Sequence, residues 1–171
     1  MSFSLDQFRL DGQVAIVTGA GGRGNSIGRA YALGLSRAGA KVVVADLNED
    51  GANRVANEIR SAGREALAVR VDITDRPSVD AMVAETKASF GGVDILVNNA
   101  APMVEIVSTP AMQIDLESWN KAIAVNLTGA LNCSQAVAPL MSERGGGRIV
   151  NQVSGGAFPA QTVYGVTKIA L

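Results

Sequence analysis

The sequence feature that most constrains this chain is a run near its N-terminus in which glycines separate two apolar segments. Residues 14–17 are all apolar, as expected for a parallel strand that helices cover on both faces. Five glycines follow between residues 19 and 28, where the backbone can adopt positive φ and approach a ligand closely. Helical spacing of apolar residues begins at Ile27, and residues 41–45 are expected to form a second buried strand, which Asp46 closes. This order predicts the strand, turn, helix and strand of a dinucleotide-binding unit.

Each part of this unit has a predicted contact with the ligand. Unpaired N–H groups at the start of the predicted helix suit a pyrophosphate. The carboxylate of Asp46 can accept hydrogen bonds from the hydroxyls of an adenosine ribose. The alternative is a glycine-rich loop that only joins a strand to a helix, and the flanking strand, helix and acidic residue disfavour it. Because the glycines are spread more widely than in a compact G-x-G-x-x-G, the pattern predicts phosphate binding without giving each glycine a role.

The composition restricts the class of protein. The 171 residues are 47% hydrophobic, which predicts one folded domain over residues 1–171. There are 15 basic and 16 acidic residues and no charge run, so no nucleic-acid partner is expected. The N-terminus lacks the apolar core of a signal peptide, and no stretch reaches the roughly 18 apolar residues of a membrane span. We therefore expect a cytoplasmic protein with no membrane partner.

The absence of histidine restricts the class of site. Ser-His-Asp and Cys-His catalytic sites are excluded, as is a histidine-ligated metal, and no metal site is predicted. Any general acid or base must be a Tyr, Lys, Asp or Glu side chain. The one cysteine, Cys133, lies in an apolar helical stretch and is expected to be a packed thiol rather than a reactive one.

The rest of the chain alternates predicted strands and helices. Asp75 and Pro77 mark the start of one helix, whose inward residues would be Val79, Met82, Val83 and Thr86. Residues 102–114 contain two prolines and read as a loop. Strands are expected at 66–71, 93–97 and 148–153, and helices at 50–61, 76–90, 115–141 and from 161 onward. This alternation predicts an α/β fold with a doubly wound, mostly parallel sheet.

Polar residues stand at or just after the ends of the predicted strands. They are Asp46, Asp72, Asn99 and Ser154. In an open parallel sheet, the ligand crevice lies at the carboxyl ends of the strands. The sequence therefore predicts that these side chains meet at one site.

Tyr164 and Lys168 are four residues apart in the last predicted helix, so the phenol and the ammonium would share one face. A positive charge beside a phenol favours the phenolate, which suits a general base. The pair alone also fits an exposed helix surface, but Ser154, whose hydroxyl could bind a substrate oxygen, favours a site. Asn126, inside the predicted long helix, is either a buried core amide or a fourth site residue, and its spacing does not decide between these.

Six motifs in order carry a family resemblance. They are Thr18-Gly19 through Ile27-Gly28, Asp72, Asn98-Asn99-Ala100-Ala101, Asn126, Ser154, and Tyr164 with Lys168. In these motifs the chain resembles the classical short-chain dehydrogenase/reductase family from its first strand to its last residue. The resemblance implies a Rossmann fold that is C-terminally incomplete, because members of the family continue past the helix that carries Tyr164 and Lys168. We expect the chain to be truncated within that helix.

The resemblance also implies a role for each site residue. Tyr164 would be the general acid/base, and Lys168 would assist it and bind the nicotinamide ribose. Ser154 would orient the reacting oxygen, and Asn126 would hold a water of the proton relay. The implied cofactor contacts come from Gly19, Ser26, Ile27, Gly28, Asp46, Asp72, Ile73, Asn99, Ala100, Tyr164 and Lys168.

The implied activity is hydride transfer between NAD and a secondary alcohol or ketone. NAD is favoured over NADP because Asp46 would repel a 2′-phosphate, a preference that Arg23 nearby could soften. The family forms homodimers and homotetramers, and the full-length form is expected to do the same. The expected small-molecule substrate is a neutral or modestly apolar alcohol, from the apolar side chains of Met103, Val104, Ile106 and Phe158. Two alternatives stay open: a non-catalytic or defective dinucleotide-binding fragment, and an NADP-linked carbonyl reductase.

Overall fold

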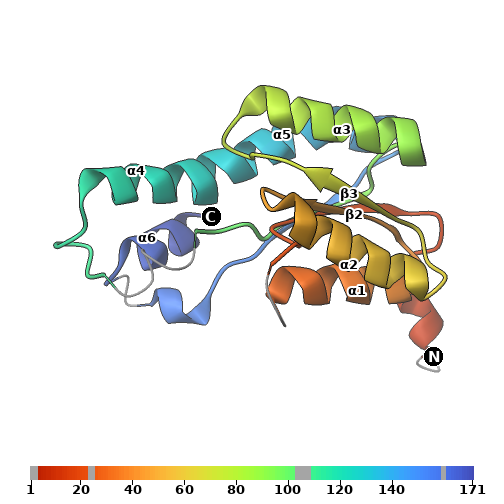
Figure 1. Ribbon diagram of the computed structural model, residues 1–171, viewed down its shortest axis with the longest axis horizontal. Helices are drawn as coiled ribbons and strands as arrows, with labels where there is room; N and C mark the ends of the chain where they lie inside the picture. Colours follow the sequence, from red (N-terminus) through yellow and green to blue (C-terminus); the bar gives the residue numbers. More distant parts are fainter. Residues whose placement is uncertain (1–3, 23–25, 103–108, 159–160) are drawn as a thin grey trace.

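Five parallel strands form one sheet in the order β3-β2-β1-β4-β5 (Figure 1). The structure is a computed structural model that describes residues 4–22, 26–102, 109–158 and 161–171. The strand order matches the first five positions of the doubly wound order 3-2-1-4-5-6, which confirms the predicted fold class. The strands are β1 Val14–Thr18, β2 Lys41–Asp46, β3 Ala66–Arg70, β4 Ile95–Asn98 and β5 Arg148–Asn151.

Helices lie on both faces of this sheet. One pair, α1 and α2, covers one face, and α3 and α5 cover the other, while α4 and α6 pack together at the left of Figure 1. The α-helices are α1 Ile27–Arg37, α2 Glu49–Ser61, α3 Arg76–Phe90, α4 Leu116–Ile123, α5 Ala130–Glu143 and α6 Val163–Ala170. The remaining helical segments are the 3₁₀ turns η1 Leu5–Phe8 and η3 Gly155–Ala157 and the π-helical segment η2 Ala124–Gly129. None of the described helices is long and apolar enough to cross a membrane.

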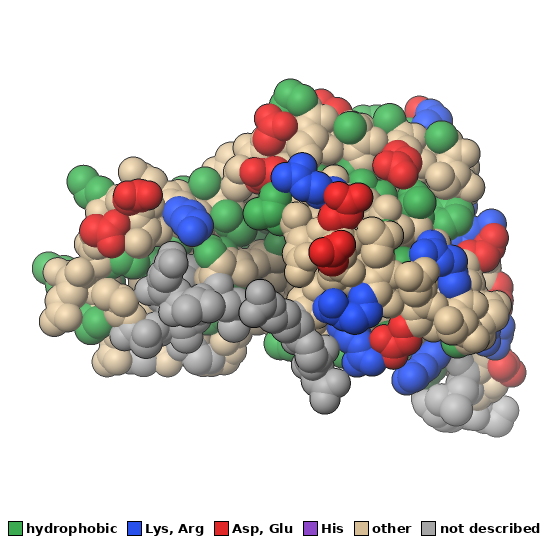
Figure 2. Space-filling model, in the orientation of Figure 1, with side chains coloured by type: hydrophobic (Ala, Val, Ile, Leu, Met, Phe, Trp, Pro, Cys, Tyr) green, Lys and Arg blue, Asp and Glu red, His purple; other side chains and the backbone are tan. Residues whose placement is uncertain are grey.

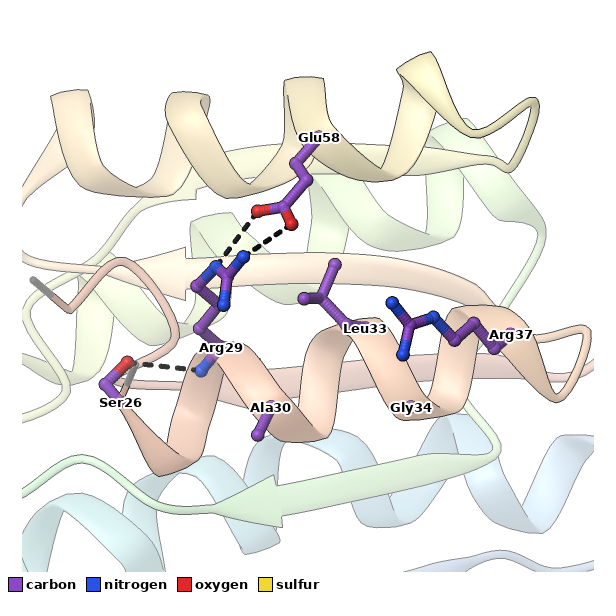
Figure 3. A pocket seen from close by; sticks show the side chains of 7 residues that line it. All are labelled: Ser26, Arg29, Ala30, Leu33, Gly34, Arg37 and Glu58. Carbon is purple, nitrogen blue, oxygen red and sulfur yellow. Dashed lines mark hydrogen bonds and ion pairs between the residues drawn. The ribbon is translucent and has the colours of Figure 1, made fainter. Parts of the chain in front are cut away.

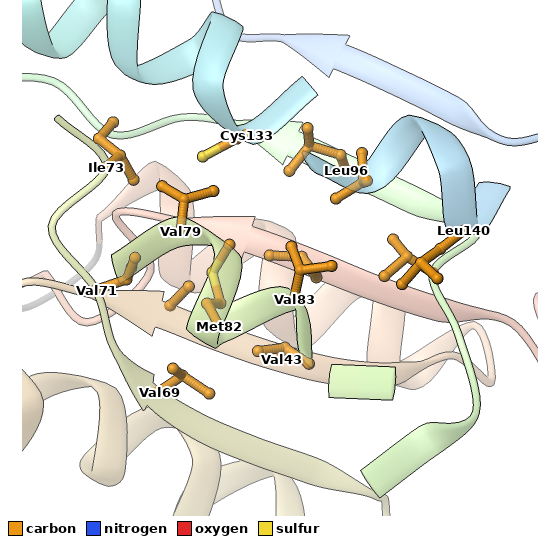
Figure 4. Close-up of a cluster of buried hydrophobic side chains, with 14 of the residues drawn as sticks. Val43, Val69, Val71, Ile73, Val79, Met82, Val83, Leu96, Cys133 and Leu140 are labelled. Atoms are coloured by element: carbon orange, nitrogen blue, oxygen red, sulfur yellow. The ribbon is translucent and has the colours of Figure 1, made fainter. Parts of the chain in front are cut away.

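The core consists of two layers because successive side chains of a strand point to opposite faces. Ala15 and Val17 of β1 pack in the layer under α1 and α2, whereas Ile16 packs in the layer under α3 and α5. Figure 4 shows the second layer, in which Val79, Met82 and Val83 of α3 pack in one cluster with side chains of the sheet and of α5. The predicted inward face of α3 is confirmed, as is the burial of Cys133 in the same layer.

Local sequence signals set the ends of several helices. Asp75 accepts a hydrogen bond from the Ser78 amide at the start of α3, as predicted, and Ser26 accepts one from the Arg29 amide at the start of α1. After α2 and α3, Gly63 and Gly91 adopt φ angles of 73° and 88°, which a residue with a Cβ rarely adopts. Helix α1 begins at Ile27, so the last residues of the glycine-rich run 19–28, called the glycine loop below, form its first turn.

Three expected segments differ from the structure. The long helix predicted over 115–141 is α4 and α5 joined by η2, and it continues to Glu143. The strand predicted over 148–153 stops at Asn151 and lies at the sheet edge, where Ile149 and Val150 are 44% and 41% exposed rather than buried. The last helix begins at Val163, after its cap Thr162, rather than at 161. A loop was predicted over residues 102–114, and residues 103–108 of it lie outside the described residues. In the described part, Pro110 forms an antiparallel bridge with Thr162.

Candidate active site

A cavity of about 870 Å³ lies at the carboxyl ends of the strands. The chain leaves β1 toward β2 on one side and returns past β1 to β4 on the other, and such a switch point is where open α/β sheets bind ligands. Every site residue predicted from the sequence lines this cavity except Asn126. Those residues are Gly19, Ser26, Ile27, Gly28, Asp46, Asp72, Ile73, Asn99, Ala100, Ser154, Tyr164 and Lys168.

Residues 19–22 of the glycine loop follow β1 and contact the residues after β4. Gly19 adopts a φ angle of 66°, and a Cβ on Gly28 would overlap the carbonyl oxygen of Gly19. The Asn99 amide donates to the carbonyl oxygens of Thr18 and Gly19 at 2.9 and 3.1 Å, so it fixes the first turn of the loop. The loop backbone therefore lies close to the first turn of α1, whose N–H groups lack intrahelical partners and suit an anion. The predicted contribution of Arg23 falls outside the described residues.

Asp46 connects the loop to the end of β2. Its two carboxylate oxygens accept hydrogen bonds from the amides of Gly21 and Asn48 at 2.8 and 2.9 Å. Each oxygen of an ionised carboxylate has two lone pairs, so each can accept one more hydrogen bond. Both oxygens can therefore accept bonds from ligand hydroxyls while they hold the loop.

Gly51 belongs to this arrangement and was missed from the sequence. A Cβ on Gly51 in the first turn of α2 would overlap the carbonyl oxygen of Gly21. A Cβ on Gly21 would in turn lie 2.5 Å from the amide nitrogen of Ala52. The two glycines thus allow α2 to pack directly on the loop, and no local sequence pattern indicates such a contact.

Side chains from β2 and β3 line the side of the cavity near Asp46. Asp72 accepts hydrogen bonds from the Thr74 amide and hydroxyl at 2.9 and 2.7 Å, and Ile73 beside it is buried. Ile27 and Leu47 are both more than half exposed and line the same cavity. Exposed apolar side chains beside a polar cleft provide a surface for a flat apolar group.

Lys168 lies on the opposite side of the cavity, on α6. Its side chain is only 2% exposed, and its Nζ donates to the carbonyl oxygen of Gln152 at 2.7 Å. The same Nζ lies 5.9 Å from the centre of the Tyr164 ring, so the ammonium and the phenol share one face of α6 as the spacing predicted. Burial lowers the pKa of Lys168 because it disfavours the charged ammonium.

Asn126 lies in η2, next to Val125, which lines the cavity. Its Nδ2 donates to the Thr167 hydroxyl of α6 at 2.8 Å, and the side chain is 1% exposed. Its Oδ1 is buried and has no hydrogen-bond partner within the described part of the chain. A buried polar atom without a protein partner is where an ordered water binds in many proteins. Asn126 is thus a buried amide whose acceptor is left for a further group, and this arrangement does not decide between the two interpretations of the residue.

Ten further residues line the cavity. Gly22 belongs to the predicted glycine loop, Ala101 to the motif that begins at Asn98, and Pro102 and Gly155 to segments where an apolar lining was expected. The remaining six were not predicted, and most of them directly precede or follow a predicted residue: Leu47, Val71, Lys121, Val125, Gln152 and Val153. Gln152 differs because it contacts both Lys168 and Tyr31 of α1, and no sequence pattern links residues 121 positions apart.

The outer surface has a second, smaller hollow along α1 (Figure 3). It has a volume of about 330 Å³ and shares only Ser26 with the larger cavity. Arg29 on its wall forms two hydrogen bonds with the carboxylate of Glu58 of α2. On the face drawn in Figure 2, acidic and basic side chains are interspersed. The described residues include no group of three or more Cys, Asp or Glu side chains placed to hold a metal ion.

Comparison with known proteins identifies the family. The family model described as short chain dehydrogenase matches residues 13–171. An uncharacterised oxidoreductase of Mycobacterium tuberculosis is 45% identical to this chain over 162 residues, which is 95% of this chain and 64% of that protein. The fold and the carboxyl-edge cavity described above agree with that match. The chain belongs to the short-chain dehydrogenase family.

Two solved structures are similar in fold as well as in sequence. One is a 7α-hydroxysteroid dehydrogenase complexed with NADH and 7-oxo glycochenodeoxycholic acid, with a TM-score of 0.89 and 37% identity over 99% of this chain and 65% of that one. The other is a gluconate 5-dehydrogenase from Burkholderia cenocepacia in complex with NADP and tartrate, with a TM-score of 0.86 and 38% identity over 97% and 64%. The chain therefore spans less than two thirds of the length of these relatives.

Proposed function

We propose that this chain carries the cofactor site and the acid/base residues of an NAD-dependent oxidoreductase that acts on a secondary alcohol or ketone. The observation that carries the proposal is that Ser154, Tyr164 and Lys168 line the same cavity as the glycine loop and Asp46. The glycine loop is a cradle that Cβ atoms would fill, as the overlap at Gly28 indicates, and this fits a pyrophosphate. The relatives bound to NADH and NADP support a nicotinamide cofactor.

The carboxylate of Asp46 supports NAD rather than NADP. It can accept hydrogen bonds from both ribose hydroxyls, and it would repel a 2′-phosphate. NADP is the second candidate because the Arg54 guanidinium lies beside the loop, where it donates to the Gly22 carbonyl oxygen at 3.2 Å. An arginine in that place could pair with a phosphate. The relative affinity for NADH and NADPH separates the two candidates.

The chain's own residues would perform the proton chemistry. Tyr164 would take the hydroxyl proton from an alcohol or return it to a carbonyl oxygen, and the Lys168 ammonium would stabilise the phenolate. Ser154 would donate a hydrogen bond to the reacting oxygen, and Oδ1 of Asn126 would bind a water that connects the site to solvent. The nicotinamide supplies the carbon that accepts or gives the hydride when the cofactor is bound.

We propose a neutral or modestly apolar alcohol as the substrate. Val125 and Val153 add apolar surface to the cavity that Tyr164 and Ser154 line. The expected contributions of Met103, Val104 and Ile106 lie outside the described residues, and Phe158 is exposed. The two solved relatives were bound to a bile-acid derivative and to tartrate, so the family resemblance does not select one substrate.

Replacing Tyr164 with Phe tests the catalytic proposal. Because only the hydroxyl is lost, we expect turnover of a panel of secondary alcohols and ketones to fall at least 1,000-fold, in line with the loss of a general acid/base, while the NADH dissociation constant changes by less than about threefold. Steady-state kinetics and calorimetric NADH titration measure the two quantities. Full turnover in Tyr164→Phe would overturn the assignment. NADH binding without turnover in the wild type would instead favour a non-catalytic dinucleotide-binding module.

A further inference from the structure

Gln152 has a hydrogen-bond partner at each of its four polar groups. Its amide nitrogen donates to the carbonyl oxygen of Asn98 at 2.9 Å, and its carbonyl oxygen accepts from Nζ of Lys168 at 2.7 Å. In the side chain, Oε1 accepts from the hydroxyl of Tyr31 at 2.5 Å, and Nε2 donates to the carbonyl oxygen of Val153 at 2.6 Å. Gln152, which directly follows β5, therefore connects the end of β4 with α1 and α6.

The direction of the Tyr31 bond follows from this geometry. A carbonyl oxygen can only accept, so the group of Gln152 that faces Val153 is the NH₂ end of the amide. The oxygen of the amide then faces Tyr31, whose hydroxyl must donate. The bond fixes the rotation of the Gln152 side chain.

Lys168 depends on the Gln152 peptide for its position. The lysine side chain has four rotatable bonds and is nearly fully buried, and the Gln152 carbonyl is a short hydrogen-bond partner of its ammonium. A shift of the peptide after β5 would move that acceptor and release Nζ. The hydrogen bond from Tyr31 of α1 to Gln152 would resist such a shift. Ile27, one turn before Tyr31 on the same helix, lines the cavity.

We propose that Gln152 is a positioning residue, which holds the Lys168 ammonium at the cavity wall and is itself held by the Tyr31 hydroxyl of α1. Through this chain of contacts, the helix that begins at the glycine loop sets the place of the lysine on α6. The inference rests on the proposed function, in which Lys168 binds the nicotinamide ribose and stabilises the phenolate. Gln152 and Tyr31 act on the cofactor only through Lys168.

Two variants remove the side-chain hydrogen bonds of Tyr31 and Gln152 with little change in side-chain shape. Tyr31→Phe removes one hydroxyl, and Gln152→Met keeps the length of the side chain without its amide. The matched control is Ser36→Ala, which removes a hydroxyl from the same helix at a place where it bonds only to the Leu33 carbonyl oxygen. A double variant, Tyr31→Phe with Gln152→Met, tests whether the two side chains act as one unit.

The first measurement is the rate at which an amine-acetylating reagent modifies Lys168 in the protein without cofactor, followed by mass spectrometry. Exposed Lys87 of α3 is the internal standard in each sample. We expect the Lys168 rate relative to Lys87 to rise three- to tenfold in Tyr31→Phe and in Gln152→Met, to rise no further in the double variant, and to stay unchanged in Ser36→Ala. Equal Lys168 rates in the wild type and both variants would overturn the proposal.

The second measurement is the NADH dissociation constant by calorimetry. We expect a three- to tenfold increase in each of the two variants and in the double variant, and no change in Ser36→Ala. Wild-type binding with unchanged affinity in the variants would refute the role of Gln152 and leave the proposed function intact. Absence of NADH binding in the wild type would refute the proposed function and with it the link from Lys168 to the cofactor.

Discussion

Gly51 lacks a Cβ, and this allows α2 to contact the glycine loop. A Cβ there would overlap the Gly21 carbonyl oxygen, and Gly21 is the residue whose amide bonds to Asp46. We expect Gly51→Ala to destabilise the fold by about 1–3 kcal/mol, as overpacking does, and to weaken NADH binding several-fold. Chemical denaturation and NADH titration measure these effects.

Gly34 provides the matched control for this prediction. It lies in the interior of α1, and a Cβ there would meet nothing within 4 Å. Gly34→Ala is expected to stabilise the fold by up to about 1 kcal/mol, because alanine has the higher helix propensity. If the two alanine variants behaved alike, the packing of Gly51 on the loop would be contradicted.

Cys133 gives the protein a pH dependence that can be isolated. Burial raises the pKa of the Cys133 thiol from its usual value of 9.0 to about 12. Between these values the unfolded chain has lost the thiol proton and the folded chain has kept it, so rising pH favours unfolding. The stabilisation is fully present below pH 9 and is lost as the pH rises toward 12, by about 1.4 kcal/mol per pH unit.

Comparison with Cys133→Ala tests this pH dependence. The variant lacks the thiol, so its free energy of unfolding should fall less steeply than that of the wild type between pH 9 and 10.5. Urea denaturation at several pH values measures both slopes, and titration of other groups is common to the two proteins. Parallel slopes would show that the thiol ionises equally in the folded and unfolded states.

At the scale of secondary-structure elements, η2 is joined to α6 by one buried side-chain pair. The Thr167 hydroxyl accepts from Asn126 and donates to the carbonyl oxygen of Tyr164 at 3.0 Å. Thr167→Val would leave Nδ2 of Asn126 buried without its hydrogen-bond partner, at a cost of about 1–3 kcal/mol. It should also lower NADH affinity, because α6 carries Tyr164 and Lys168. Denaturation and titration report the two effects.

Thr86 of α3 is the control for Thr167. It is equally buried, but its hydroxyl bonds only to the carbonyl oxygen of Met82 in its own helix. Thr86→Val should therefore cost less than about 1 kcal/mol and leave NADH affinity unchanged. A cost for Thr167→Val no larger than this would contradict a structural link between η2 and α6.

The same elements show which features the sequence could predict. Asp75 caps α3 and the inward residues of α3 follow a 3.6-residue period, and both signals are local. The π-helical segment around Asn126 has no local signature in the sequence. The apolar sequence of β5 likewise did not indicate that Ile149 and Val150 are 44% and 41% exposed.

The candidate site also contains features that the sequence predicted and features that it did not. Asp46, Asn99 and Ser154 follow strand ends, so the topology alone predicted that they would meet. The contacts between Gly21 and Gly51 and between Tyr31 and Gln152 join segments that are distant in the sequence. Such contacts depend on how whole helices pack, and no residue pattern indicated them.

At the scale of the whole molecule, the amino and carboxyl ends of the parallel strands have different surroundings. At the amino edge, Asp94 accepts hydrogen bonds from the amide of Val14 and from the guanidinium of Arg144, which ties β1 to the end of α5. At the carboxyl edge, loops and helix ends surround the cavity instead. The hydrogen bonds at the amino ends of the strands are structural, and the cavity proposed to bind the cofactor lies at the carboxyl ends.

The most direct test of a dinucleotide site at the carboxyl edge is calorimetric titration of the wild-type protein with NADH and with NADPH. We expect one NADH molecule to bind per chain, with an affinity at least tenfold higher than that for NADPH, because Asp46 accepts ribose hydroxyls and repels a 2′-phosphate. Tighter binding of NADPH would contradict the role of Asp46, and absence of binding for both nucleotides would contradict the dinucleotide site itself.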